Sequence, residues 1–157
     1  MHSVEAFLAV SDALGTPEYR RRAGMIIRRV IGFAKALEWR IPEHFDQQWT
    51  PRPDFNADHK DDQFKPYGAT PGHGLEWARL IAQWALASYA HHDIDEAERD
   101  ATGAASEQLF ARAVADGWNA DGEPGFVYTV DWQGRPIVHD RMHWALAEGI
   151  NTAFMLY

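Results

Sequence analysis

Apolar positions along the chain recur with the spacing of α-helices. From Tyr19 to Leu37 they return every three or four residues, and basic side chains fill most of the positions between them. This pattern is typical of a helix with one buried face. Pro17 suits a first helical turn, Glu18 favours the positive end of the helix, and the Thr16 hydroxyl is expected to cap it. We therefore predict a helix from about residue 17 to 37.

A second pattern, from Gly72 to Tyr89, places apolar side chains in nearly every direction around a helix axis. Such a helix must be buried on all sides. Similar spacing predicts three further helices, from about 3 to 14, ending near 116–117, and from about 142 to 157. Buried and half-exposed types alternate along the chain, which predicts an all-α protein with alternating inner and outer helices.

Two interruptions separate these helices. The stretch from Trp39 to Pro71 is rich in proline and contains a strand-like piece at 45–50. Connections of this length usually line a binding site or are disordered. The second interruption, 126–132 and 135–139 with Gln133-Gly134 between them, predicts a β-hairpin.

Composition narrows the class of protein. Of the 157 residues, 46% are hydrophobic, the formal net charge is −8, and there is no cysteine. A nucleic-acid or anionic-membrane partner is not expected, because such binders need a concentrated positive surface. Without cysteine there is no disulfide framework and no thiolate chemistry. With no signal peptide and no long apolar run, we expect a cytoplasmic protein.

A short pattern recurs at intervals of about 70 residues. His2 and His73 each precede a glutamate by three positions, and His143 opens a third helix that carries Glu148. A repeated helix pair would place equivalent helix starts on one rim. The chain also opens and stops within helices, and five helices do not close a ring. We expect a fragment of a larger helical barrel, with a small complete bundle as the alternative.

His73 is the leading candidate for chemistry. It follows Thr70-Pro71-Gly72 and so lies in a first helical turn, whose positive potential is expected to keep the imidazole neutral and basic. Glu76, one turn on, could orient the ring or accept from a ligand hydroxyl. Trp77 and Trp84 follow on nearly the same stripe and could stack on a sugar. The alternative is a core histidine with Glu76 as a buried ion-pair partner.

Other chemistries fit less well. Metal-ligand spacings occur at His73 with Glu76, at 91–93, and at His139 with His143. The pair at 91 and 92 more simply ends a helix, and residue 139 ends a strand rather than a helical turn. There is no P-loop and no nucleophile elbow. We therefore expect neither a metal nor an organic cofactor.

Several motifs together carry a family resemblance. The run from Phe64 to Leu80 (FKPYGATPGHGLEWARL) is joined by MHSVEA at 1–6, GFVYTVD at 125–131 and DRMHWALAE at 140–148, in that order. These resemble the N-acylglucosamine 2-epimerase superfamily, and within it the mannose isomerase and sulfoquinovose isomerase branch. The resemblance implies an (α/α)6 barrel, of which residues 1–157 would form one incomplete domain from the central and later part.

The resemblance also implies roles for individual residues. His73 would be the catalytic acid/base, and the family's second catalytic histidine would lie outside this chain. Pocket positions match His2 and Glu76, a basic position near substrate matches Lys65, and Trp144 would border the sugar. Trp77 and His143 are two further candidates for contact with the substrate. The predicted substrate contacts are therefore His2, Lys65, Glu76, Trp77, His143 and Trp144.

The implied reaction is interconversion of a mannose-type aldose and its ketose through an enediol, with a monosaccharide as the small-molecule partner. A sugar 2-epimerase of the same superfamily remains the first alternative. A non-catalytic sugar-binding or protein-binding relative is the second. A helical-barrel glycosidase would need a carboxylic acid partner for Glu76, which the sequence does not display.

Overall fold

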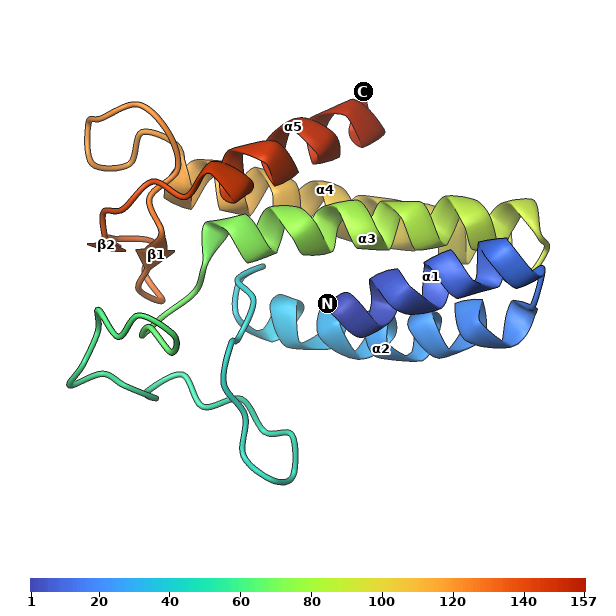
Figure 1. Cartoon of the computed structure of the whole chain (residues 1–157), viewed down its shortest axis with the longest axis horizontal. Coiled ribbons are helices and arrows are strands. Elements are labelled where there is room, and N and C mark those ends of the chain that lie inside the picture. The colour runs from blue at the N-terminus through green and yellow to red at the C-terminus, as the bar shows by residue number, and fades with distance from the viewer.

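Five helices and one small antiparallel sheet make up the fold (Figure 1). The computed structural model describes all residues from 1 to 157. In chain order the elements are α1 (His2–Leu14), α2 (Pro17–Ala36), α3 (Pro71–Ala90), α4 (Glu96–Gly117), β1 (Thr129–Val130), β2 (Pro136–Val138) and α5 (His143–Leu156). All five predicted helices are confirmed, with ends within one or two residues of the predictions.

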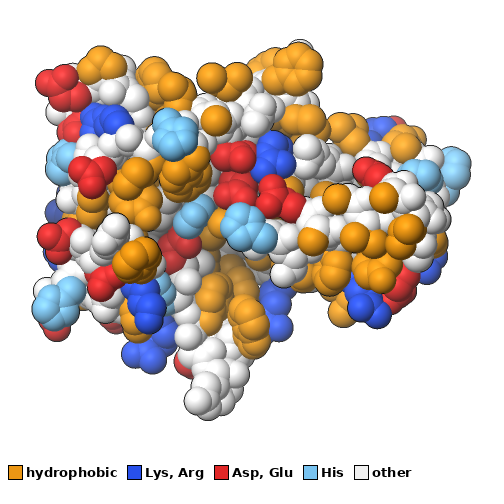
Figure 2. All heavy atoms as spheres, viewed as in Figure 1, with side chains coloured by type: hydrophobic (Ala, Val, Ile, Leu, Met, Phe, Trp, Pro, Cys, Tyr) orange, Lys and Arg blue, Asp and Glu red, His pale blue; other side chains and the backbone are white.

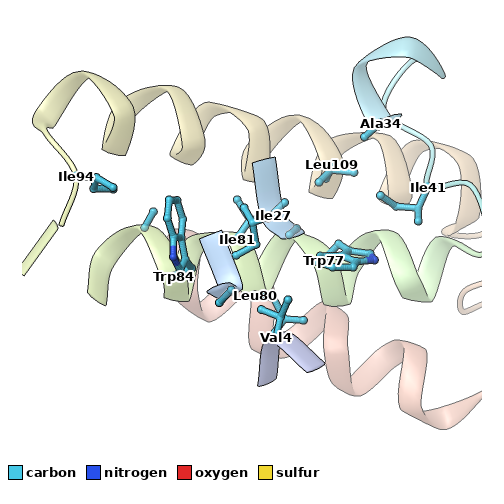
Figure 3. Packing of buried hydrophobic residues seen from close by; sticks show 13 residues of the cluster. Val4, Ile27, Ala34, Ile41, Trp77, Leu80, Ile81, Trp84, Ile94 and Leu109 are labelled. Atoms are coloured by element: carbon cyan, nitrogen blue, oxygen red, sulfur yellow. The ribbon is translucent and has the colours of Figure 1, made fainter. Parts of the chain in front are cut away.

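Helix α3 is the centre of the molecule. It packs against every other helix, and side chains on all its faces are buried, as its sequence pattern predicts. Trp84, Leu80 and Ile81 are almost completely enclosed. Figure 3 shows these side chains meeting Val4 of α1, Ile27 of α2 and Leu109 of α4 in one continuous core. Since α3 has neighbours on all sides, its position defines the positions of the other helices.

Helices α1 and α2 form an antiparallel hairpin along one side of α3 (Figure 1). Gly15 ends α1 in the left-handed conformation, with φ of 63°. The predicted cap of α2 is wrong in one detail, because the Thr16 hydroxyl points back to the carbonyl oxygen of Leu14, 3.4 Å away. Arg20 departs from the expected polar face. It is buried, and its Nε donates to Asp93 across 2.6 Å.

The last helix is less enclosed than α3. Helix α5 buries few residues, and Ile150, Phe154 and Tyr157 are exposed on its outer side. The reason is that α5 has helical neighbours, α3 and α4, on one side only. No helix of the chain combines the length and the apolar character that crossing a membrane requires.

The long connection between α2 and α3 contains no regular strand. The strand-like piece at 45–50 forms only an isolated bridge between Phe45 and Pro51, so that prediction is wrong. The hairpin is confirmed, although its strands are shorter than predicted. Gly134 turns between them with φ of 79°. Figure 1 shows the long connection and the hairpin at the same end of the molecule, where α3 begins.

The contact between α2 and α3 depends on a glycine. A Cβ at Gly24 would lie 2.5 Å from the ring of Trp84, whose Nε1 donates to the carbonyl oxygen of Arg20 across 2.9 Å. Because the indole is buried and bonded, it cannot move away. We expect Gly24→Ala to destabilise the fold by about 1–3 kcal/mol through overpacking, measured by urea or thermal unfolding.

Gly32→Ala is the matched control, since a Cβ there meets nothing within 4 Å in the same helix. This variant should be stabilised by about 0.5–1 kcal/mol, because alanine loses less backbone entropy than glycine in a helix. Equal effects of the two substitutions would contradict the packing described for Gly24.

Candidate functional site

His73 is the third residue of α3. The chain immediately before it is held by a pair of backbone hydrogen bonds between Ala69 and Val130, each 2.9 Å long. The imidazole is therefore attached to a helix end that is fixed by the hairpin on one side and by the core on the other. Its side chain is 26% exposed, so the ring can be reached from solvent.

The partner of His73 is Glu43, a residue that sequence reasoning did not select. Nδ1 of His73 lies 2.9 Å from Oε1 of Glu43. Glu76, which the sequence offered either as an orienting group or as an acceptor for a ligand hydroxyl, makes no hydrogen bond to the ring. Glu43 lies 30 residues earlier, in the irregular connection, where no periodicity marks any acidic residue. The only sequence signal was the general one that long connections line binding sites.

An ion pair anchors the chain just before Glu43. Arg40 is buried, and its guanidinium donates to both carboxylate oxygens of Asp116 at the end of α4, over 2.8 and 3.3 Å. Ile41 and Pro42 follow and are buried as well. Glu43 is thus the first partly exposed residue after a fixed segment, and its carboxylate is only 17% exposed. Two-point Arg–carboxylate contacts define orientation as well as distance.

Trp144, from the first turn of α5, covers one face of the His73 ring. The two ring centroids are 5.2 Å apart and the planes differ by 30°. Gly72 permits this approach, because a Cβ there would lie 2.6 Å from the indole. The fold therefore brings together His73 and Trp144, two of the residues that the sequence singled out.

The electrostatic surroundings of His73 include more than the helix terminus. Burial would lower its pKa, but the charge and hydrogen bond of Glu43, helped by the charge of Glu76, outweigh burial and raise the pKa above its ordinary value. The helix terminus was expected to lower the pKa of the ring, and the carboxylate of Glu43 acts in the opposite direction. A nearby carboxylate acts more strongly on the ring than the partial charge of a helix end.

A second polar cluster lies one turn further along α3. His2, Glu5 and Glu76 place ligand-type atoms within 4.8 Å of one another, and Nδ1 of His2 is 2.9 Å from the Glu5 carboxylate. Glu76 is 6% exposed and accepts no hydrogen bond. Burial raises its pKa, and the charges of Glu148 and Glu5 add to the increase, against the opposing effect of His73. A buried carboxyl of this kind is suited to holding or exchanging a proton.

Arg79 joins this cluster to α5. Its guanidinium donates to Glu148 over 2.6 and 3.1 Å and to Glu5 over 3.0 Å. In Figure 2 acidic side chains surround a basic one near the middle of the face, with histidines beside them. A groove of about 540 Å³ begins here, between α1, α3 and α5, and is lined by Glu5, Arg79, Gln83 and Met155 among others. The cluster could hold a cation or hydrogen-bond a polyhydroxylated ligand.

Other predicted site residues are not brought into these clusters. Trp77 is 5% exposed and packs in the core beside Ile41 and Leu109, and its predicted contact with a sugar stays a prediction. Trp84 is buried in the same core. The side of α3 that carries Trp77 and Trp84 faces α2 and α4 rather than solvent.

Lys65 and His143 lie at the surface. Only the backbone of Lys65 is bonded, with its N–H donating to Asp62 across 2.8 Å, and its ammonium contacts no partner. His143 is exposed at the start of α5 and makes no hydrogen bond. Their predicted contacts with substrate stay predictions.

The other histidines considered as metal ligands have separate surroundings. His139 binds Asp121 across 2.6 Å, and Arg141 binds the same carboxylate. This arrangement ties the loop after α4 to the start of α5. His91 and His92 are exposed where α3 ends. None of these histidines lies in a group of three side chains close enough to share a metal ion. His2, Glu5 and Glu76 form the one such group in the chain.

Known proteins share this sequence and fold. The chain is 42% identical to D-mannose isomerase of Pseudomonas cannabina pv. alisalensis and 42% identical to D-mannose isomerase of Thermobifida fusca. Each match covers 99% of this chain and 37% of the relative. A crystal structure of D-mannose isomerase, 26% identical, superposes with a TM-score of 0.84 over 98% of this chain and 37% of that one.

These matches account for the arrangement of helices. The chain spans about a third of the length of the relatives it matches, and its five helices form part of an (α/α)6 barrel, as the resemblance implied. The model of the N-acylglucosamine 2-epimerase (GlcNAc 2-epimerase) family matches residues 1–157. Because that match extends over the whole sequence, the chain belongs to the N-acylglucosamine 2-epimerase family.

Proposed function

We propose that this chain contributes part of the active site of a sugar isomerase that interconverts a mannose-type aldose and its ketose. The observation that carries the proposal is the setting of His73, an accessible imidazole held by Glu43, stacked on Trp144 and followed by the polar cluster of His2 and Glu76. The names of the relatives support mannose as the substrate. The cytoplasmic setting and the single incomplete domain stay predictions.

The proposed chemistry needs no cofactor. His73 removes the proton from C2 of the open-chain aldose, and the electron pair of that bond forms the C1–C2 double bond of an enediol while the carbonyl oxygen gains a proton. The imidazolium then returns its proton to C1, and the C2 hydroxyl loses a proton as it becomes the ketose carbonyl. A base whose pKa lies near the working pH serves both steps. The charge and hydrogen bond of Glu43 outweigh burial and raise the pKa of His73 above its ordinary value, which makes the imidazole a stronger base for proton removal.

Glu76 and His2 are proposed to contact the sugar oxygens. Glu76 is buried and its carboxyl pKa is raised, so the group can carry a proton and pass it to an oxygen that becomes negative. His2 is 86% exposed on its side chain and lies beside Glu76, where it can donate to or accept from a hydroxyl. Trp144 would present its remaining surface to the C–H face of the sugar.

A 2-epimerase is the second candidate, favoured by the description of the matching family. A 1,2-shift can run on one face of the enediol with one base, whereas inversion at C2 requires a proton donor on the opposite face. His73 supplies one such group, and the resemblance places the second catalytic histidine outside this chain, so the names of the relatives, rather than the geometry of His73, favour the isomerase. The product decides between them, since mannose yields fructose by isomerisation and glucose by epimerisation.

Turnover of the sugar should depend on His73. Residues 1–157 are grafted in place of the matching segment of the Thermobifida fusca relative, which is 42% identical over 160 residues. The hybrid should convert mannose to fructose, and His73→Gln should lower kcat by about 100-fold or more, because proton transfer by a positioned base contributes roughly 10²–10⁴-fold. Product is measured by chromatography.

His91→Gln in the same hybrid is the control, since His91 is an exposed histidine at the far end of α3. It should leave kcat unchanged. A His73→Gln hybrid that keeps most of its turnover would refute the assignment of His73 as the base.

A second prediction concerns the chain without the rest of the barrel. We expect residues 1–157 alone to produce no fructose from mannose, because the resemblance places a second catalytic histidine outside this chain. The same chromatographic assay, at high protein concentration and with the hybrid as positive control, measures this. Fructose formed by the isolated chain, and lost in His73→Gln, would contradict the prediction.

A further inference from the structure

Glu43 and His73 form an isolated pair at the start of α3. The 2.9 Å contact joins Oε1 of Glu43 to Nδ1 of His73, and Nε2 of the ring makes no hydrogen bond. The side chains are 17% and 26% exposed, so water reaches the pair only in part. A carboxylate can accept hydrogen bonds but cannot donate them. The hydrogen in this contact must therefore be carried by Nδ1.

We propose that Glu43 is a positioning residue that fixes the tautomer of His73, with the hydrogen on Nδ1 and the free electron pair on Nε2. The role of Nε2 as the atom that meets the substrate rests on the proposed isomerase function. The tautomer itself does not, because it follows from the contact in the protein without sugar.

The surroundings of the ring single out Glu43 for this role. From α5, Trp144 offers only its apolar face. From α3 itself, Glu76 contributes a charge that raises the pKa of His73 but makes no hydrogen bond to it. The amino group of Met1, next to α1, lowers that pKa. On the hairpin side, Tyr128 is a titratable group that responds to Glu43. Burial and the charge of Glu43 both raise the pKa of its phenol. Glu43 is the one group bonded to the imidazole.

The pair is also built to hold its geometry. Arg40 and Asp116 fix the chain three residues before Glu43, and the backbone pair of Ala69 with Val130 fixes the chain before His73. The stacked Trp144 ring limits rotation of the imidazole of His73 about its Cβ–Cγ bond. A hydrogen-bond partner on one ring nitrogen fixes the tautomer and the orientation of a catalytic imidazole. The ring then loses less conformational entropy when the transition state forms.

The experiment uses the 157-residue chain labelled with ¹⁵N-histidine. Two-bond ¹H–¹⁵N spectra distinguish protonated from unprotonated ring nitrogens, and a pH titration follows each ring. The signals of His73 are those lost in His73→Gln. Above its pKa, His73 in the unaltered chain should show hydrogen on Nδ1 and a free Nε2.

Two substitutions separate the hydrogen bond from the charge. Glu43→Gln keeps a side-chain oxygen that can accept from Nδ1, so the tautomer should persist while the pKa of His73 falls. Glu43→Leu removes both, so the form with hydrogen on Nε2 should appear and the pKa should fall as well. Glu107→Gln removes one exposed carboxylate that contacts no charged group and should change neither quantity.

Circular dichroism checks that each variant keeps its helices. If Glu43→Leu does not fold, the tautomer of the unaltered chain still tests the proposal, and the pKa of His73 in Glu43→Gln, where glutamine matches glutamate in size, still tests the contact with Glu43. Hydrogen on Nε2 in the unaltered chain would overturn the proposal, as would an unchanged tautomer and titration in both Glu43 variants. No turnover is involved, so loss of the isomerase assignment would leave this result intact.

Discussion

Burial of α3 on all sides is the constraint on which the rest of the structure depends. A helix whose faces are all apolar can be stable in water only when other elements surround it. Here α1 and α2 cover one side while α4 and α5 cover the others. The close approach of Gly24 to Trp84 and of Gly72 to Trp144 shows how tightly these neighbours pack. Consequently the first turn of α3, with His73, has one defined position.

The candidate site arises where this rigid helix meets irregular chain. Glu43 reaches His73 from the long connection, and that connection is held by Arg40 on Asp116 and by backbone pairing with the hairpin. Carboxylates then determine the electrostatics. Glu43 raises the pKa of the imidazole against the effect of burial, and the cluster around Glu76 concentrates negative charge that Arg79 only partly balances. The proposed base and the polar cluster thus lie one helical turn apart.

The sequence predicted the helices well because apolar spacing reflects burial directly. It also indicated His73, Glu76 and Trp144, whose positions at helix starts and in family motifs are local features. It gave no sign that Trp77 lies in the core, because a helix buried on all sides does not reveal which of its faces packs against which neighbour. It missed Glu43, whose partner lies 30 residues away and is reached only through tertiary folding. Residues on regular elements could be predicted, whereas contacts made by irregular chain could not.

The central claim is that His73 acts by moving a proton through an enediol. The most direct test runs the hybrid enzyme on mannose in deuterated water and reads the label in the product by NMR. Because the imidazolium can exchange its hydrogen with solvent before returning it, deuterium should appear at C1 of fructose, and this labelled product should vanish with His73→Gln. Fructose formed at full rate with no deuterium at C1, by the unaltered hybrid and by His73→Gln alike, would indicate direct hydride transfer and would contradict the account.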